Sequence, residues 1–466
     1  MILPPEVEEL IASLRGEIAM LRAEAAELRR RLGQDSSTSS KPPSSDGLKK
    51  KPRIAGSLRE ASGKPGGGQK DHKGDTLRQV AEPDRVVRHT ASTCRHCQAL
   101  LASGMARGVE TRQVFDLVER PLVVTEHQAA IYRCERCRRV TTAAFPEGVT
   151  SPAQYGERIK AAAIYLNVQQ LIPEDRTAQA LGDLFGAPRL CPASVAAWVR
   201  KKARDLERVH ALIGARLSQA KVRHLDETGL RVAGKLHWLH TTSSQTLTFY
   251  RADEKRGAIP EGLNGGVVVH DGFAPYSRLT ALAHALCNAH HLRELKGLIE
   301  LDGEAWAAPM RDMLLDANAA VRKARAAGAN ALAPDQVKAF VERFWAAVRE
   351  GMAFHRALPR LARNPKAGGR RKHRPGFNLL ARFKKFKHDA LRFLTDFDVP
   401  FTNNLAEQDL RMMKVKMKIS GAFRTLQGAQ DFACLRSIVS TARKQRYDIL
   451  QTLAANPRQI HNALFA

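Results

Sequence analysis

No stretch of this sequence is both long and apolar enough to cross a bilayer, so we expect no transmembrane segment. The start, MILPPEVEEL, lacks the basic and apolar regions of a secretory signal, and we therefore expect no signal peptide. Acidic residues are few beside basic ones: 47 Asp and Glu face 75 Lys and Arg, and the net charge is +28. Such a surplus favours a nucleic-acid partner over the alternatives of a membrane surface or an acidic protein.

Cysteine is also sparse, with seven residues and therefore an odd count. In a chain without a secretion signal, this favours a reducing cytosol and metal ligation over disulfides. Four of the seven form two C-x-x-C pairs: Cys94, Cys97, Cys134 and Cys137. Four thiolates make the tetrahedral set that structural Zn²⁺ prefers, so we predict a zinc-binding module at residues 85–145; the alternative is four unligated thiols.

The N-terminal segment carries an apolar heptad pattern. Its two rows are offset by four residues and consist of Val7, Leu14, Leu21 and Leu28, and of Ile11, Ile18, Ala25 and Leu32. This pattern predicts a coiled-coil helix at 6–33 that joins copies of the chain; the alternative is a single amphipathic helix on the protein's own surface. Residues 34–80 are rich in Ser, Pro, Gly and basic residues, and we predict a solvated linker there.

The period of the apolar residues divides the rest of the chain. Strands are expected between the cysteine pairs, in RQVFDLVER and LVVTEHQAAIYR. Residues 155–210 have a helical period, with Gly186 as a stop and Ser194 as a cap, which favours a helix-turn-helix over a generic helical bundle. From residue 222 the period is two, which predicts strands in LRVAG, KLHWLHTT and TLTFYRAD, and then the buried strand VVVHD. Helices are expected again at 290–350.

Three acidic residues, far apart in the chain, have unusual local contexts. Asp271 closes the buried run VVVH, Asp226 lies just before the strand LRVAG, and Glu407 lies near the start of a helix. If the two strands are neighbours, both aspartates lie at one edge of a sheet, with Glu407 on a helix packed across that edge. Carboxylates arranged in this way can hold two Mg²⁺ ions against a phosphodiester, which is the chemistry of cutting and joining nucleic-acid strands.

Each of these carboxylates also has an ordinary structural alternative. Asp226 could end a strand beside a solvated Glu227, and Asp271 could begin an Asp-Gly turn. Glu407 could complete a helix capping box with Asn404. Taken singly, these alternatives compete with the metal-binding interpretation.

The helix that contains Glu407 has a basic face and an apolar face. Its basic residues follow the acid at spacings of 4, 7 and 11 and lie on one side: Arg411, Lys414 and Lys418. The adjoining apolar stripe consists of Leu410, Met413 and Met417. Basic residues in line with a metal-binding carboxylate would follow a phosphate backbone, whereas the alternative is a surface face of i,i+4 ion pairs.

The chain resembles a known family, the bacterial insertion-sequence transposases of the IS sixty-six family (the large DDE-type subunit). The matching segments cover nearly the whole chain: the leucine-zipper start, SSKPPSSD, GGGQKDHKGDTL, the paired C-x-x-C motifs, LDETGLRV, VHDGFAPY and TNNLAEQDLRMMKVKMKISGAFRTLQGAQDFACLRSIVSTARKQ. The resemblance implies a ribonuclease-H-like catalytic core, with Asp226, Asp271 and Glu407 as its D, D, E metal triad. It further implies Mg²⁺ or Mn²⁺ as the catalytic cofactor, beside structural Zn²⁺.

The resemblance implies a multidomain α+β chain. After the coiled coil, linker and zinc module, the expected parts are a helix-turn-helix DNA-binding domain at 155–210, the catalytic core at 220–300 and 396–450, a basic helical insertion at 301–395, and a C-terminal tail at 451–466. Terminal inverted repeats and target DNA are the implied partners, contacted by Arg411, Lys414, Lys418 and Arg424. Homo-oligomers through the coiled coil, accessory proteins of the same element, and a cytoplasmic, nucleoid-associated location are further expectations.

A cysteine-histidine block follows the second aspartate, and the resemblance leaves its role open. Cys287 and His291 are spaced i,i+4 on a predicted helix and could form half of a metal site, with His290 between them. A packing and hydrogen-bonding role is the favoured alternative.

Three functions are compatible with these patterns. The first hypothesis is a transposase that binds the ends of its element, cleaves a 3′ end and transfers it to target DNA. The second is a DNA-binding regulator or an inactive remnant, for which three acids facing phosphates would serve no purpose. The third is a ribonuclease-H-like nuclease or resolvase without strand transfer, which only the family resemblance disfavours.

Overall fold

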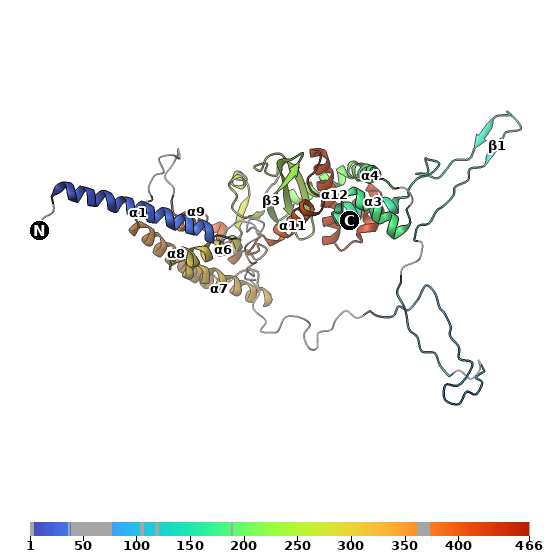
Figure 1. Cartoon of the computed structure of the whole chain (residues 1–466), viewed down its shortest axis with the longest axis horizontal. Coiled ribbons are helices and arrows are strands. Elements are labelled where there is room, and N and C mark those ends of the chain that lie inside the picture. The colour runs from blue at the N-terminus through green and yellow to red at the C-terminus, as the bar shows by residue number, and fades with distance from the viewer. Residues whose placement is uncertain are drawn as a thin grey trace. The chain divides into compact units, whose positions relative to one another are not determined.

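The computed structural model describes residues 4–35, 38, 77–102, 107–116, 121–187, 190–359, 361 and 373–465 (Figure 1). The chain divides into two units, Met1–Ala55 with Ala129–Ala466, and Gly56–Gln128. Each unit is described by itself below. Within the described ranges, none of the helices combines the length and the apolar character that crossing a membrane requires.

A five-stranded mixed sheet lies at the centre of the larger unit. Its strands are β3 (Val222–Val232), β4 (Lys235–Ser243), β5 (Thr248–Asp253), β6 (Val267–His270) and β7 (Ala283–Leu286). They lie in the order β5-β4-β3-β6-β7. β4 is antiparallel to both of its neighbours, β3 and β5, whereas β6 runs parallel to both β3 and β7. β6 is buried along its whole length, as its continuous apolar run predicts.

β3 is longer than the sequence pattern predicts. The alternation in LRVAG marks only its second half, because the strand begins at Val222. It continues into β4 through Ala233 and Gly234, whose φ angles of 47° and 79° suit a tight two-residue hairpin. Asp226 therefore lies within a strand, opposite Thr241 of β4, and the prediction that it lies before one was wrong. Polar residues next to Asp226 interrupt the apolar alternation by which a strand is predicted. Pairing with both β4 and β6 stabilises the strand there.

Helices from two parts of the chain cover the sheet. They are α5 (Glu207–Ser218), α11 (Asn404–Ile419) and α12 (Leu426–Lys444). α12 packs on β5, α11 packs on β3 and β4, and α5 packs on β4 and β5. The predicted apolar stripe of α11 is confirmed, because Leu410 and Met413 are buried in this core and Met417 packs against it. The chain then ends with α13 (Ile449–Ala454) and α14 (Pro457–Phe465).

Between β7 and α11 the chain forms a helical region with a core of its own. Its helices are α6 (Asn288–Glu300), α7 (Ala307–Ala326), α8 (Pro334–Ala357), α9 (Pro375–Lys385) and α10 (Lys387–Leu391), and a 3-10 segment, Arg392–Leu394, follows them. Trp306, Phe344 and Phe383 are among the largest fully buried side chains of this core. α6 begins directly after β7, so it connects the helical region to the sheet.

Three helices that precede the sheet pack around a small apolar cluster that includes Leu181. They are α2 (Glu157–Ile164), which continues into the π-helical segment Tyr165–Gln169, α3 (Glu174–Phe185) and α4 (Pro192–Asp205). α3 ends at Gly186, whose left-handed φ of 71° confirms the predicted stop. The predicted cap at Ser194 was wrong, because α4 begins at Pro192 with Cys191 before it. Proline suits the first helical position and sets the earlier start.

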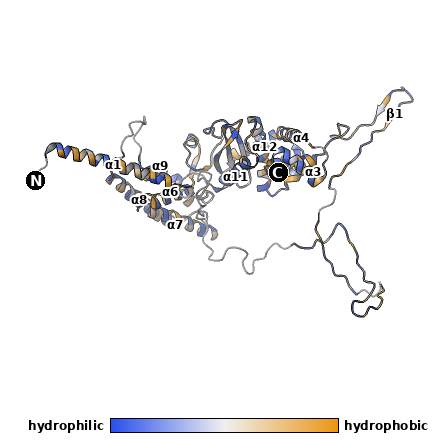
Figure 2. Ribbon diagram, in the orientation of Figure 1, coloured by the Kyte–Doolittle hydropathy of each residue, from blue (hydrophilic) through white to orange (hydrophobic). Residues whose placement is uncertain are grey.

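α1 (Pro5–Gly33) is one continuous helix, as the heptad pattern predicts. Figure 2 shows hydrophobic and hydrophilic residues alternating along it. Leu14, Leu21 and Leu28 of its apolar row are 48%, 59% and 52% exposed, so they are not covered by this chain's own surface. This exposure favours self-association over the alternative of a surface helix, and the coiled coil stays a prediction.

The described residues of the smaller unit mostly lack regular secondary structure. Gln113 exchanges two side-chain hydrogen bonds of 2.8 Å with the backbone of Val80. Residues 107–116 contain no strand, so the strand predicted in RQVFDLVER was wrong over that part. The second predicted strand, LVVTEHQAAIYR, forms only at its end. There, in the larger unit, β1 (Ile131–Arg133) pairs with β2 (Val140–Thr142). Many of the described apolar residues between the cysteine pairs are exposed, among them Val109, Val114 and Val123.

Candidate functional site

Two aspartates lie at the same level of the sheet, on neighbouring parallel strands. The pairing of β3 with β6 runs as far as His224 opposite Val269, and Asp226 and Asp271 each lie two residues further along. β6 ends at His270, so Asp271 follows the carboxyl end of a buried strand, as predicted. In open α/β sheets, this is the edge at which ligands bind.

Backbone amides and burial determine how readily the carboxyl groups of both aspartates ionise. Oδ1 of Asp271 accepts a hydrogen bond of 2.8 Å from the N–H of Phe273, across a turn in which Gly272 has a φ of 92°. Oδ1 of Asp226 accepts one of 2.9 Å from the N–H of Glu227. Burial raises the pKa of both carboxyl groups, and for Asp226 the negative charge of Asp271 raises it further. Two ionised carboxylates here would need a cation between them.

Glu407 reaches the aspartates from α11. The helix begins at Asn404 and packs on β3 and β4, which directs its first turn toward Asp226. After burial and the charges of Asp271 and Glu227, the charge of Glu407 also contributes to the raised pKa of Asp226. The alternative of a capping box is wrong, because Asn403 is the N-cap residue and no side chain caps the helix. The fold thus brings all three predicted acids to one place.

A cysteine and a histidine lie behind Glu407. Its Oε1 is 3.8 Å from Nδ1 of His290 and 4.0 Å from Sγ of Cys287. The ligand atoms of these three residues lie within 4.8 Å of one another, close enough to hold a metal ion. His291 is turned away, with its Nδ1 2.9 Å from Oδ1 of Asn288. This hydrogen bond is consistent with the packing and hydrogen-bonding role favoured for His291, and the half-site with Cys287 stays a prediction.

Asn403, which the sequence analysis did not single out, fixes α11 against β3. Its side chain is 1% exposed. Its Nδ2 donates a hydrogen bond of 2.8 Å to the carbonyl of Leu225, and its Oδ1 accepts one of 2.9 Å from Nδ1 of His224. Both partners immediately precede Asp226.

The backbone of Asn403 continues this network to the other two acids. Its carbonyl accepts a hydrogen bond of 3.3 Å from the N–H of Glu407. Its own N–H donates to Sγ of Cys287 at 3.1 Å. The N–H of Cys287 donates in turn to the carbonyl of His270 at 2.8 Å, one residue before Asp271. One asparagine therefore connects the three chain segments that carry the acids.

Glu227 is not the solvated neighbour considered above, because its side chain is only 1% exposed. It accepts hydrogen bonds of 2.7 Å from the hydroxyl of Tyr276 and 2.9 Å from Nη2 of Arg256. The guanidinium of Arg256 lies 4.9 Å from the ring centre of Trp238 and 4.3 Å from that of Phe273. The two rings and the carboxylate hold a positive charge beside the aspartates.

The basic face of α11 lies next to the acids. Burial lowers the pKa of Lys414, while the carboxylates of Asp226 and Glu407 raise it, which places this ammonium group close to both. The three other basic residues predicted to contact DNA are exposed: Arg411, Lys418 and Arg424. Among the ion pairs of the described ranges, Glu407 pairs with Arg293 of α6, at 4.0 Å, and not along α11. The alternative of an i,i+4 ion-paired face is therefore wrong for this acid.

The donor set suits a hard divalent cation. Carboxylate oxygens are the ligands that Mg²⁺ and Mn²⁺ prefer, and Mg²⁺ needs only a few of them because it keeps waters and binds phosphate. The carboxylates come from a strand, a strand end and a helix, so the fold fixes their spacing. Asp226 forms no ion pair within the part of the chain that is described, and its negative neighbours oppose its ionisation. A bound cation would reverse that repulsion.

The two C-x-x-C pairs form turns of the same geometry. In each, the N–H of the first cysteine, Cys94 or Cys134, donates a hydrogen bond of 2.9 Å to the carbonyl five residues later. The residues after the second cysteines, Gln98 and Arg138, are left-handed, with φ of 59° and 57°. Backbone N–H groups of the turn lower the pKa of both first thiols, which favours the thiolate that Zn²⁺ binds.

Comparisons with known families match three segments of the chain. A family model described as Transposase IS66 family, the family of the resemblance noted above, matches residues 152–431. A model described as the zinc-finger binding domain of transposase IS66 matches residues 91–138, which contain both cysteine pairs. A family of unknown function, DUF6444, matches residues 2–78. No curated protein and no solved structure matches the chain.

Proposed function

We propose, from the premise that the chain belongs to the IS66 family of transposases, that it cleaves the 3′ ends of its element and joins them to target DNA. Asp226, Asp271 and Glu407 would hold the catalytic Mg²⁺ or Mn²⁺. The observation that carries this proposal is the meeting of three carboxylates from β3, the end of β6 and the first turn of α11. The family's zinc-finger domain is also present, with four cysteines that suit structural Zn²⁺.

We further propose that the sheet is the centre of a ribonuclease-H-like core. The support is its topology: the first strand, β3, lies in the middle, two antiparallel strands lie on one side, and two parallel strands lie on the other. This order sets the acid of β3 beside the acid that follows β6. The helical region α6–α10 then falls between the second and the third acid.

The proposed chemistry is in-line displacement at phosphorus. When bound, the divalent ions would activate the attacking oxygen and stabilise the leaving oxygen. Asp226 and Asp271 fix the sheet side of the site, and Glu407 fixes the helix side. Nη2 of Arg293 lies 4.0 Å from Oε1 of Glu407, and Lys414 interacts electrostatically with Asp226 and Glu407, so positive charge borders the place where the phosphate would lie. No covalent protein intermediate is needed.

DNA binding is proposed to use the zinc finger, the basic face of α11 with Arg424, and a helix-turn-helix made by α3 and α4. Support for the last comes from α4, on which Arg200, Lys201 and Arg204 are exposed. Their charges would contact phosphates of a terminal inverted repeat. Self-association through the exposed leucines of α1 would bring two ends together.

The test compares variants that remove one charge with little change in volume. We expect Asp226→Asn and Glu407→Gln to bind a terminal-repeat duplex like the wild type and to lose 3′-end cleavage. Gel shift measures the binding, and a denaturing gel measures the nick. The matched control is Glu261→Gln, an exposed acid on a loop, which should change neither.

Two outcomes would contradict the proposal. Joint loss of binding and cleavage in both variants, with reduced stability, would indicate a structural role for the acids. Tight end binding without cleavage by the wild type, in Mg²⁺ and in Mn²⁺, would favour a DNA-binding regulator.

A further inference from the structure

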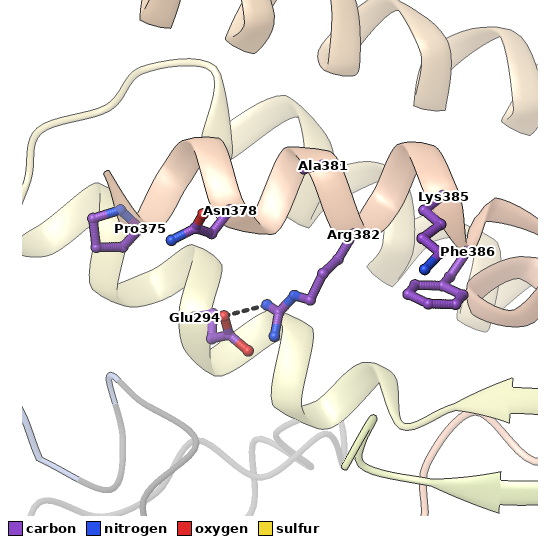
Figure 3. A pocket seen from close by; sticks show the side chains of 7 residues that line it. All are labelled: Glu294, Pro375, Asn378, Ala381, Arg382, Lys385 and Phe386. Carbon is purple, nitrogen blue, oxygen red and sulfur yellow. Dashed lines mark hydrogen bonds and ion pairs between the residues drawn. The ribbon is translucent and has the colours of Figure 1, made fainter. Parts of the chain in front are cut away.

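A cavity of about 550 Å³ opens between α6 and α9, in the helical region. Its lining residues are Glu294, Pro375, Asn378, Ala381, Arg382, Lys385 and Phe386. Figure 3 shows that all but one come from α9 and its C-terminal end, and that Arg382 extends across the cavity to Glu294 on α6. The cavity is therefore a groove with one basic wall and a single carboxylate opposite.

The basic wall has N–H donors left for an anion, although the Lys385 ammonium lies 4.9 Å from the ring centre of Phe386. From His373 to His388 the chain contains five Lys and Arg residues and no acid. Arg382 and Lys385 line the groove, and both are exposed. The Arg382 side chain is 43% exposed, and its Nη2 donates to Glu294. A guanidinium has five N–H donors, so the ion pair leaves donors for a second partner. Lys385 forms no ion pair within the described ranges.

α6 is shared by the groove and the carboxylate site. At its start, His290 lies 3.8 Å from Glu407. Glu294 follows one helical turn later, which corresponds to about 6 Å along the helix axis. Successive phosphates of one strand are about 3.4 Å apart along a duplex axis, so a strand that runs along α6 would cover this separation with about two nucleotides. His291 also packs on Phe383 of α9, at a ring distance of 4.8 Å, which holds the two walls together.

We propose that the groove between α6 and α9 binds the phosphodiester backbone of the reacting DNA, about two nucleotides from the phosphate at the carboxylates. The proposal rests on the proposed function and adds a DNA contact outside α11, the zinc finger and α3–α4. Lys385 and the free donors of Arg382 bind phosphate oxygens. Glu294 limits the affinity by holding Arg382 and by repelling the backbone.

The first test measures affinity for a terminal-repeat duplex as a function of NaCl concentration, by fluorescence anisotropy. Loss of one phosphate contact lowers the slope of log K against log salt by about 0.9, so Lys385→Gln should show that decrease. Lys338→Gln removes the same charge from an exposed site on α8 and should leave the slope unchanged. Glu294→Gln should bind more tightly, whereas a purely structural ion pair would give weaker binding through misfolding.

The second test locates the contact. Single phosphates of the duplex are replaced by neutral methylphosphonates, and binding is measured for the wild type and Lys385→Gln. We expect one or two positions, about two nucleotides from the cleavage site, to weaken wild-type binding and to have no further effect in the variant.

The outcomes separate this inference from the proposed function. If Lys385→Gln and wild type share the same salt slope and the same methylphosphonate pattern, the groove is not a DNA contact, while cleavage by the wild type leaves the proposed function intact. If an excess of an acidic peptide, but not of duplex, protects Lys385 from chemical acetylation, the groove binds protein instead. A wild type that binds no DNA overturns both proposals.

Discussion

Asn403 offers the sharpest test of how the site is built. Asn403→Ala removes the donor to Leu225 and the acceptor for His224, at distances of 2.8 Å and 2.9 Å. Both partner groups stay buried in the sheet, where each unsatisfied group costs about 1–3 kcal/mol. The variant should therefore lose about 2–6 kcal/mol of unfolding free energy.

Urea denaturation of the full chain measures that loss, with the unfolding of the sheet and its helices monitored by circular dichroism. The matched control is Asn404→Ala, the next residue, which is exposed at the first position of α11. It should stay within about 0.5 kcal/mol of the wild type, as surface substitutions usually do. Cleavage is the second readout, measured where Asn403→Ala is still folded. Displacement of Glu407 from Asp226 by about 1 Å should lower the rate about 100-fold.

Two results would refute this reasoning. If Asn403→Ala is as stable as Asn404→Ala, the two buried hydrogen bonds do not hold α11 to β3. If the variant is destabilised but the folded protein cleaves at the wild-type rate, the asparagine stabilises the fold without positioning Glu407.

Further predictions concern other parts of the chain. Elemental analysis should find about one zinc per chain, and Cys134→Ser should release it and weaken end binding while the sheet stays folded. Leu14→Asp with Leu21→Asp should shift the chain toward monomer in analytical ultracentrifugation; an unchanged mass would exclude α1 as the contact. Burial raises the pKa of Glu304 to about 6 from its usual 4.5. Its protonated form stabilises the fold below pH 4.5, and that stability is lost as pH rises through 6. The free energy of unfolding of the wild type should therefore fall by about 2 kcal/mol over that pH window, and that of Glu304→Gln should not. Identical pH profiles of the two proteins would contradict the raised pKa of Glu304.

The sequence predicted the features that depend on local pattern. The buried run of β6 with Asp271 at its end, the stop at Gly186 and the apolar stripe of α11 are all present, because each is set by side-chain period or by glycine's freedom to take a positive φ. The three acids could be singled out because their contexts were unusual and because long segments resembled a family. Their closeness in space depends on the parallel pairing of β3 with β6.

The features that the sequence did not reveal depend on contacts between distant residues. Asp226 was misplaced because a strand paired on both sides tolerates polar residues that a local pattern interprets as loop. The burial of Glu227 could not be predicted from its neighbours, because its partner Arg256 lies 29 residues away. Asn403 gave no signal, since an asparagine before a helix usually caps it, whereas this one turns to β3.

The most direct test of the central claim is nicking of a labelled terminal-repeat duplex by the wild type and by Asp271→Asn, with and without Mg²⁺ or Mn²⁺. We expect a 3′-end nick that requires the divalent ion and is lost in the variant, while end binding is equal for both. Cleavage by Asp271→Asn at the wild-type rate, or cleavage by the wild type in excess EDTA, would contradict it.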